Sequence, residues 1–390
     1  MANTTAGVVA SSSKSLLTEV IKRHPLGKRI QYGIAAFILT RLIQKPLIFF
    51  SALGRFIRAR RESDPDVIKS YPVRKHLSVR IFLPTPNPPE GTKLPTLLTI
   101  HGGGFMLGSP HDNDGWNRAF SARHNFLVIA LDYSKAPSVV FPTPLHDVEA
   151  LIACVLSDSS LPIDHSRIAV AGFSAGGNLS LSVSQLPSVR PHIRAVVPFY
   201  PVVDLSVPTA VKTRTRPYKP ALGGFRGRST DFLTHMIPLF NWAYLTPGQR
   251  TDDPLLSPFY ASREDLPKNV FIVACELDIL AAEAWRMACK LAGKKVPKVE
   301  EAVGRPEPFE GEEKGELITE GDERYAWDVI LEDGSRYSWL LVPDTAHGFD
   351  QDNIGDIARD PVFVADGQAK RAQVIDLVGR WLLDGPLKGK

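Results

Sequence analysis

Residues 167–179, R-I-A-V-A-G-F-S-A-G-G-N-L, predict a turn between a strand and a helix. The apolar run 168–171 is typical of a short buried strand in a parallel sheet. It leads into Gly172-Phe173-Ser174-Ala175-Gly176, which matches G-x-S-x-G, and the residues after it can form a helix. A serine on such a turn has a strained backbone, so its neighbours two positions away must be small. The pattern predicts Ser174 as an exposed nucleophile with the N–H of Ala175 beside it.

The charge of the chain is unevenly distributed. The 390 residues carry a net charge of +4, with 44% hydrophobic and 23% charged residues, which is ordinary for a soluble globular enzyme. Residues 1–61 contain eleven Lys/Arg and one acid, a balance of +10, so residues 62–390 sum to −6. The main body is therefore not expected to bind nucleic acid. The three cysteines show no metal-type spacing and no disulfide framework, which favours a reducing compartment.

Residues 1–65 are predicted to form a basic N-terminal segment. Residues 1–13 are small and polar and lack the basic start of a secretory signal, so we expect a cytoplasmic or peripherally membrane-associated protein. The apolar run 30–50 is interrupted by Arg41, Lys45 and Pro46, which makes it too short to span a bilayer. Two compatible interpretations are open: a helical part of a cap over the active site, or a basic amphipathic helix on a membrane surface.

A glycine run follows the second predicted strand of the catalytic body. Strands are predicted over 76–83, 94–100 and 126–131, and the apolar spacing of 144–156 predicts a helix. The strand 94–100 runs into H-G-G-G-F at 101–105. Consecutive glycines let backbone N–H groups face outward, as acyl transfer requires when charge develops on a carbonyl oxygen. A flexible turn is the alternative; a phosphate-binding loop would need a further glycine pattern or a Lys-Ser/Thr pair, which the sequence lacks.

Together, H-G-G-G-F at 101–105 and G-F-S-A-G-G at 172–177 resemble the hormone-sensitive-lipase-like family of α/β-hydrolases. D-Y-S-K-A-P at 132–137 and F-P at 141–142 are similar to further motifs of that family. The resemblance covers about residues 76–385 and implies an α/β fold with a mostly parallel central sheet, helices on both faces and a helical cap. It also implies an oxyanion hole made by Gly103, Gly104 and Ala175. Phe173 and Ser134 depart from the family pattern; these departures are expected to affect substrate preference rather than the reaction chemistry.

The acid and the base of the triad are expected after the nucleophile. The strand predicted over 270–274 is followed by C-E-L-D-I-L, which is similar to the family's E-x-D-P-L segment and places the acid at Asp278. Glu276 is a rival, expected on the opposite side of an extended chain. A last strand over 337–342 precedes D-T-A-H-G-F, so His347 is predicted as the base that takes the Ser174 proton. The other nine histidines are interpreted as surface or cap residues.

Two segments are predicted to lie outside the core, which comprises residues 66–204 and 251–390. Residues 205–250 are expected to form the cap, in which Phe232 and Met236 are candidates for substrate binding together with Phe105 and Phe173; hydrophobic anchoring is an equal alternative for the cap residues. Residues 297–335 are an acidic insertion, with thirteen acids and three bases between 300 and 333. We expect it to be solvated and mobile, with a strand or hairpin at its end.

These residues predict a serine hydrolase that cleaves a carboxylic ester through an acyl-enzyme, on a specialised or lipid ester, without metal or cofactor. Its partner is then a small-molecule ester or acyl substrate; a homodimer and a membrane contact are left open. An acyltransferase or thioesterase would use the same triad, and a cyclase or dehydratase would use the base without acylation. A non-enzymatic ligand receptor is the remaining alternative, and the presence of both Ser174 and His347 weighs against it.

Overall fold

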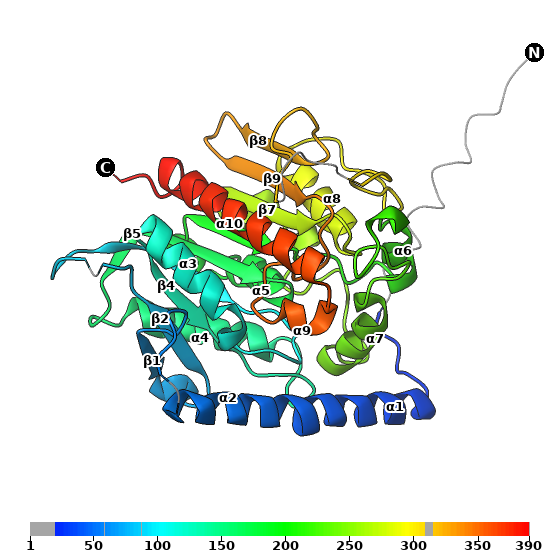
Figure 1. Cartoon of the computed structure of the whole chain (residues 1–390), viewed down its shortest axis with the longest axis horizontal. Helices are drawn as coiled ribbons and strands as arrows, with labels where there is room; N and C mark the ends of the chain where they lie inside the picture. Colours follow the sequence, from blue (N-terminus) through cyan, green and yellow to red (C-terminus); the bar gives the residue numbers. More distant parts are fainter. Residues whose placement is uncertain (1–19, 58, 87, 309–314, 390) are drawn as a thin grey trace, which may run out of the picture.

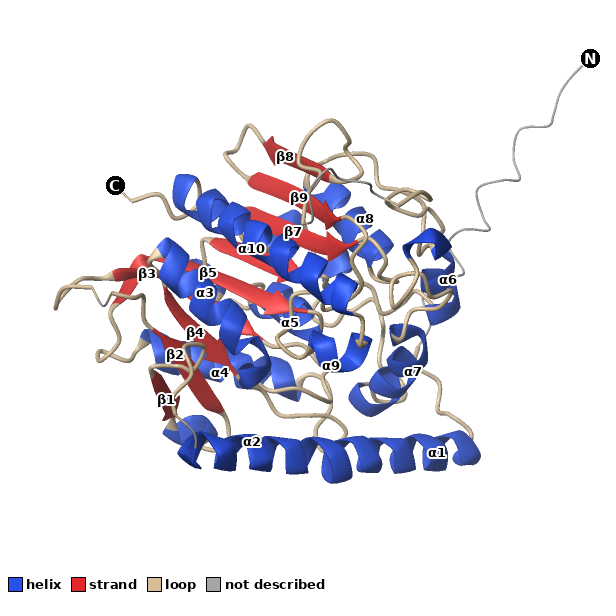
Figure 2. Ribbon diagram, viewed as in Figure 1, coloured by secondary structure: helices blue, strands red, loops and turns tan. Residues whose placement is uncertain are grey.

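A nine-stranded sheet forms the centre of the computed structural model, which describes residues 20–57, 59–86, 88–308 and 315–389 (Figures 1 and 2). The strand order is β1-β2-β4-β3-β5-β6-β7-β9-β8. The strands from β4 to β9 in this order are parallel, and antiparallel pairings add β1, β2 and β8 at the two edges. The strand bounds are β1 (Val67–Ser70), β2 (Ser78–Phe82), β3 (Leu94–Ile100), β4 (Leu127–Leu131), β5 (Ile163–Phe173), β6 (Ala195–Phe199), β7 (Asn269–Cys275), β8 (Ala326–Ile330) and β9 (Arg336–Val342).

Helices cover both faces of the sheet, and each face has its own apolar core. Leu151 of α4, Leu179 of α5 and Met287 of α8 belong to one buried cluster. Trp116 of α3 and Val378 of α10 belong to the other. The predicted fold class, a mostly parallel sheet between two layers of helices, is confirmed. The α-helices of the core are α3 (Asp114–His124), α4 (Thr143–Leu156), α5 (Ala175–Val183), α8 (Ala281–Leu291), α9 (Ile354–Ala358) and α10 (Pro361–Asp384).

Residues 205–250 lie beyond the ends of the parallel strands and contain α6 (Thr209–Arg214) and α7 (Leu233–Tyr244) (Figure 1). The N-terminal segment lies next to α7. There the helical turns of α1 (Leu26–Phe37), the π-helical η1 (Ile38–Gln44) and α2 (Lys45–Ile57) continue directly into one another. Tyr32 of α1 contacts Trp242 of α7, with ring centroids 5.8 Å apart. None of the helices in the described residues is long and apolar enough to cross a membrane. The expectations for residues 1–13 lie outside the described residues.

The acidic insertion is anchored to the core within its described residues 297–308 and 315–335. Val303 and Tyr325 are completely buried. The hydroxyl of Tyr325 donates to Glu276, and the backbone N–H of Arg305 donates to the same carboxylate at 2.8 Å. The end of the insertion forms β8, which pairs with β9. These parts of the insertion are therefore not wholly solvated, because they bury apolar side chains and satisfy a buried acid; most of their other residues are exposed or half-buried.

Candidate active site

Ser174 occupies the sharp turn between β5 and α5, as the sequence predicts. Its φ of 57° and ψ of −116° lie outside the helical and strand regions. A Cβ on Gly172 would meet the carbonyl oxygen of Gly176 at 2.0 Å, and a Cβ on Gly176 would meet that of Ile100 at 2.1 Å. Only glycine fits at either position. Strands β3 and β5 are neighbours, and Ile100 near the end of one pairs with Gly172 near the end of the other. The glycine run 102–104 and Ser174 therefore lie next to each other at the same edge of the sheet.

Ser174, His347 and Asp278 form one hydrogen-bonded chain in the buried loops after β5, β7 and β9. The Nε2 atom of His347 lies 2.8 Å from the Oγ of Ser174, and its Nδ1 lies 2.6 Å from the Oδ2 of Asp278. Because an ionised carboxylate only accepts, Nδ1 carries the hydrogen and Nε2 is free to accept from the serine hydroxyl. The other carboxylate oxygen of Asp278 accepts from the N–H of Leu280 at 2.9 Å, which fixes its orientation.

The electrostatic environment favours a basic imidazole. Burial opposes the charged form of His347, but the charge and hydrogen bond of Asp278, with smaller contributions from Asp231 and Asp350, raise its pKa above the ordinary value. Asp231 was not predicted from the sequence. It accepts from the N–H of Leu233 at 2.9 Å and from that of Ile279 at 3.2 Å, so it joins the start of α7 to the loop that carries Asp278. Burial and the neighbouring charge of Asp278 raise the pKa of Asp231 to about 6.

Glu276, the rival acid, lies away from the histidine. Its Oε2 lies 2.8 Å from the buried ammonium of Lys219 and accepts from the N–H of Asp344 at 2.8 Å. The expected reason for this separation was wrong, because the chain is not extended here: β7 ends at Cys275 and a turn follows. The turn sends the two carboxylates to different sites. Glu276 anchors the insertion and the loop after β9, whereas Asp278 contacts His347.

The glycine run passes beside the serine in a conformation that requires glycine. Gly103 has a φ of 111°, and a Cβ there would lie 2.2 Å from the backbone oxygen of Leu107. Gly104 has a φ of 60°, and the ring of Phe240 from α7 occupies the place of its Cβ, at 2.3 Å. Gly104 and Ala175 line the same cavity as Ser174, whereas Gly103 is not part of that lining.

A group of polar side chains, His101, Asp132, Tyr133 and Lys135, supports the glycine run, and none of them was predicted to be functional. His101 is buried, stacks on Tyr133 with ring centroids 4.4 Å apart, and contacts Asp132 at 3.1 Å. The hydroxyl of Tyr133 donates to the carbonyl oxygen of Gly102 at 3.2 Å. Lys135 pairs with Asp132 at 2.6 Å. The interpretation of His101 as a surface or cap residue is wrong, because its side chain is buried. The D-Y-S-K motif at 132–135 was the pattern in the sequence from which this group could have been predicted.

Comparisons with known proteins agree with this geometry. A family model described as the alpha/beta hydrolase fold matches residues 97–310. The chain belongs to the hormone-sensitive-lipase-like family of α/β-hydrolases. It is similar to an arylesterase of Saccharolobus solfataricus, with 30% identity over 226 residues that cover 57% of this chain and 68% of the arylesterase. It is also 34% identical to carboxylesterase NlhH of Mycobacterium tuberculosis over 146 residues, 36% of this chain and 45% of that enzyme. The recognition made from the sequence motifs is confirmed.

A solved structure shows the same fold. The carboxylesterase EstE1 from a metagenomic library aligns with 94% of this chain and 99% of its own, with a TM-score of 0.58 and 23% identity. At this identity the likeness shows the fold alone. The matched relatives are esterases, so the prediction of an ester-hydrolase type is confirmed at the level of the family.

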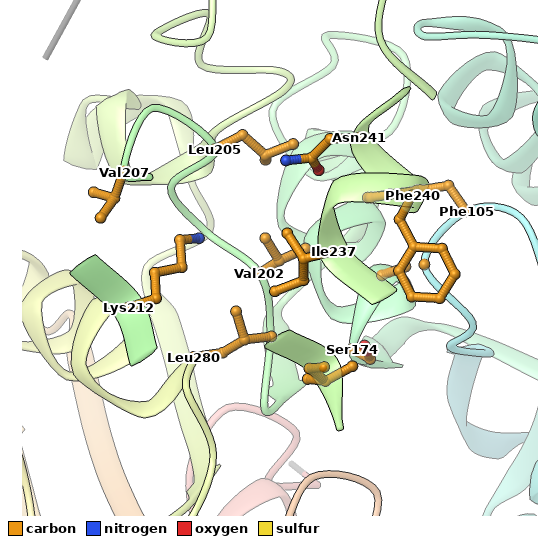
Figure 3. A pocket seen from close by; sticks show the side chains of 13 residues that line it. Phe105, Ser174, Val202, Leu205, Val207, Lys212, Ile237, Phe240, Asn241 and Leu280 are labelled. Atoms are coloured by element: carbon orange, nitrogen blue, oxygen red, sulfur yellow. The ribbon is translucent and has the colours of Figure 1, made fainter. Parts of the chain in front are cut away.

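In this α/β-hydrolase a narrow cavity of about 40 Å³ opens onto Ser174 (Figure 3). Most of its lining is apolar, and polar side chains come from Ser174, Lys212 and Asn241. The ammonium of Lys212 donates to the carbonyl oxygen of Asp204 at 2.7 Å and pairs with Glu283. The remaining lining residues are Gly104, Phe105, Ala175, Val202, Leu205, Val207, Leu233, Ile237, Phe240 and Leu280.

The four aromatic and Met candidates for substrate binding lie in different places. Phe105 lines the cavity and stacks on Tyr244, with ring centroids 3.9 Å apart. Phe232 lies outside the lining, with its ring 6.3 Å from that of His347. Met236 packs against the core cluster instead of the cavity. Phe173 requires a correction: its ring points to the other face of the sheet and stacks on Phe199 at 4.9 Å, because alternate residues of β5 face opposite sides.

In the part of the chain that the structure describes, no group of three or more His, Cys, Asp or Glu side chains is arranged to hold a metal ion.

Proposed function

We propose that this protein hydrolyses carboxylic esters through a covalent acyl-enzyme at Ser174. The observation that carries the proposal is the chain of hydrogen bonds from Ser174 through His347 to Asp278, at the floor of a cavity that Gly104 and Ala175 also line. A nucleophile, a base and an orienting acid in this order are the constellation for acyl transfer.

The reaction begins when the Oγ of Ser174 attacks the acyl carbon while the Nε2 of His347 takes its proton. The carboxylate of Asp278 stabilises the imidazolium that forms. The backbone N–H groups of Gly103, Gly104 and Ala175 donate to the carbonyl oxygen as it becomes negatively charged. His347 then returns the proton to the leaving alcohol. In the second half-reaction a water molecule gives its proton to His347 and attacks the acyl-serine, which releases the acid and restores Ser174.

The lining of the cavity supports an ester whose acyl or alcohol part is largely apolar. Val202, Leu205 and Ile237 surround the space in front of Ser174 in Figure 3. Apolar walls with a few fixed polar groups are the usual composition of a small-molecule site. The ammonium of Lys212, which points into this space, is the place where an oxygen-bearing group of the substrate would be bound.

A fluorophosphonate and a series of p-nitrophenyl esters test the proposal. We expect one covalent adduct and steady release of p-nitrophenol from the wild type, and neither from Ser174→Ala. Ser180→Ala is the matched control, because Ser180 lies on the same helix and donates its hydroxyl to the carbonyl oxygen of Gly177 at 2.8 Å. An adduct without turnover until an alcohol or thiol acceptor is added would favour acyl transfer. A folded wild-type protein with no adduct would contradict the acyl-enzyme and favour cyclisation or ligand binding.

A further inference from the structure

The continuous helix over residues 26–57 presents an apolar face to solvent. Eleven of its large apolar side chains are between 41% and 68% exposed. Contiguous apolar surface of this extent is characteristic of an interaction site, whereas single exposed residues are ordinary. The eleven are Leu26, Ile30, Ile34, Phe37, Ile38, Leu42, Ile43, Leu47, Phe49, Phe50 and Leu53.

The exposed face is the one turned away from the protein. Ala36 is buried, and Tyr32 and Leu39 pack against the core cluster. At 100° per residue, Ile34 and Phe37 point to the opposite side of the helix from these three. Figure 1 shows α1 and α2 in line along one edge of the molecule. The helix is about 48 Å long at 1.5 Å per residue, which gives a straight, accessible apolar edge.

The charge of the helix indicates what covers this edge. Residues 26–57 contain five Lys/Arg and no acid. At its start, Arg23, His24 and Arg29 line a groove of about 460 Å³ beside Trp242 of α7. Basic side chains next to an apolar stripe complement an anionic lipid surface, where each base within reach contributes about 1 kcal/mol. A second copy of this chain would bring two equally basic helices together, which like-charge repulsion disfavours.

We propose that the helix over residues 26–57 docks the protein on an anionic phospholipid bilayer, with its apolar stripe in the boundary between headgroups and acyl chains. A consequence follows for the substrate, and this part rests on the proposed function. Asn241 lines both the basic groove and the catalytic cavity, so α7 contributes to the walls of both. Docking brings this wall of the cavity to the bilayer, and the substrate class is an apolar ester dissolved in the membrane.

Flotation of the full chain with phospholipid vesicles tests the docking without requiring activity. We expect binding to vesicles that contain phosphatidylserine, weaker binding to phosphatidylcholine alone, and a decrease with rising salt. The double variant Ile34→Gln/Phe37→Gln should bind at least about 10-fold more weakly, because two exposed apolar side chains are lost from the stripe. The matched control is Ile330→Gln/Val362→Gln, whose apolar side chains are 68% and 56% exposed elsewhere on the surface; its binding should not change. Thermal unfolding verifies that both variants are folded.

Three outcomes would overturn the docking proposal. The first is that the wild type fails to bind phosphatidylserine vesicles at low salt. The second is that the helix variant and the control variant bind equally well. The third is that the wild type forms a stable dimer without lipid and the helix variant is monomeric, in which case a second copy of the chain covers the apolar face. The substrate class is tested separately with wild-type protein: a short soluble ester should be cleaved equally with and without vesicles, and a long-chain ester should be cleaved faster when presented in phosphatidylserine vesicles. Cleavage of neither ester would instead contradict the proposed function and leave the flotation result standing.

Discussion

Asp278 and Glu276 are two residues apart in the sequence, but replacing each by its amide should affect different properties: turnover for Asp278 and stability for Glu276. In Asp278→Asn the Oδ1 keeps its bond to the N–H of Leu280, so the amide NH2 takes the position 2.6 Å from the Nδ1 of His347. Because this NH2 donates, Nδ1 must accept, and the hydrogen moves to Nε2. The imidazole can then no longer take the proton of Ser174. We expect kcat to fall by about 10³–10⁴, equivalent to about 4–5.5 kcal/mol of transition-state stabilisation, with little change in stability.

Glu276→Gln leaves the triad intact but removes a negative charge from a buried cluster. Lys219 keeps Asp344 as a partner at 2.6 Å. We therefore expect the free energy of unfolding to fall by about 3 kcal/mol, the low end for breaking a buried ion pair, and kcat of the folded fraction to stay within a factor of a few. p-Nitrophenyl ester turnover and urea unfolding measure the two effects. Loss of turnover in Glu276→Gln at unchanged stability, with an active Asp278→Asn, would refute the assignment of the acid.

Three further substitutions address the surroundings of the triad. Gly104→Ala should reduce kcat at least about 100-fold, because φ is positive and the new methyl group collides with Phe240; the double variant with Phe240→Ala should recover part of the loss, and full turnover in the single variant would contradict this packing. Asp231→Asn removes a charge that helps to raise the pKa of His347; since the base must be neutral, the acid limb of the kcat/KM profile should move to lower pH, and an unchanged limb would exclude the coupling. Lys212→Met should destabilise the fold by about 3–5 kcal/mol in denaturant unfolding, because its buried carboxylate partner loses its cation; stability equal to the wild type would show that the pair contributes nothing.

The elements that carry the chemistry were predictable because their backbone geometry restricts the sequence. Glycine is the only residue type that fits at positions 172 and 176 around the Ser174 turn, so the turn can be recognised in the sequence. Strands β3 and β9 are buried along almost their whole length and read as apolar runs that end in the catalytic loops. The edge strand β1 was missed because four residues with exposed or half-exposed side chains carry no such signal. Strand β6 was missed because it contains a proline, Pro198, which is unusual within a central strand.

The lining of the cavity was less predictable, because it depends on how α7 is placed over the sheet. Phe232 and Met236 belong to the cap and are apolar, but the rotation of the chain around α7 turns Ile237 and Phe240 toward Ser174 instead. The role of Asp231 likewise depends on a contact with a loop almost fifty residues further along the chain. Such contacts follow from tertiary packing and leave no periodic pattern in the sequence.

The packing of the acidic insertion sets where this chain tolerates changes in length. Arg305 and Tyr325 both donate to Glu276, so this carboxylate holds together two points of the chain that are twenty residues apart. Between them, Gly315 donates to Asp366 and accepts from Gln373, so it is a second point of attachment to the core. Lengthening the loop between two such attachments costs little free energy, since the entropy of closure grows only with the logarithm of its length. Tags, fluorescent proteins or foreign peptides placed at the exposed residues 319–321 should therefore be accepted. The same additions placed within β8 would break its pairing with β9, so residues 319–321 are the better site for labelling the protein.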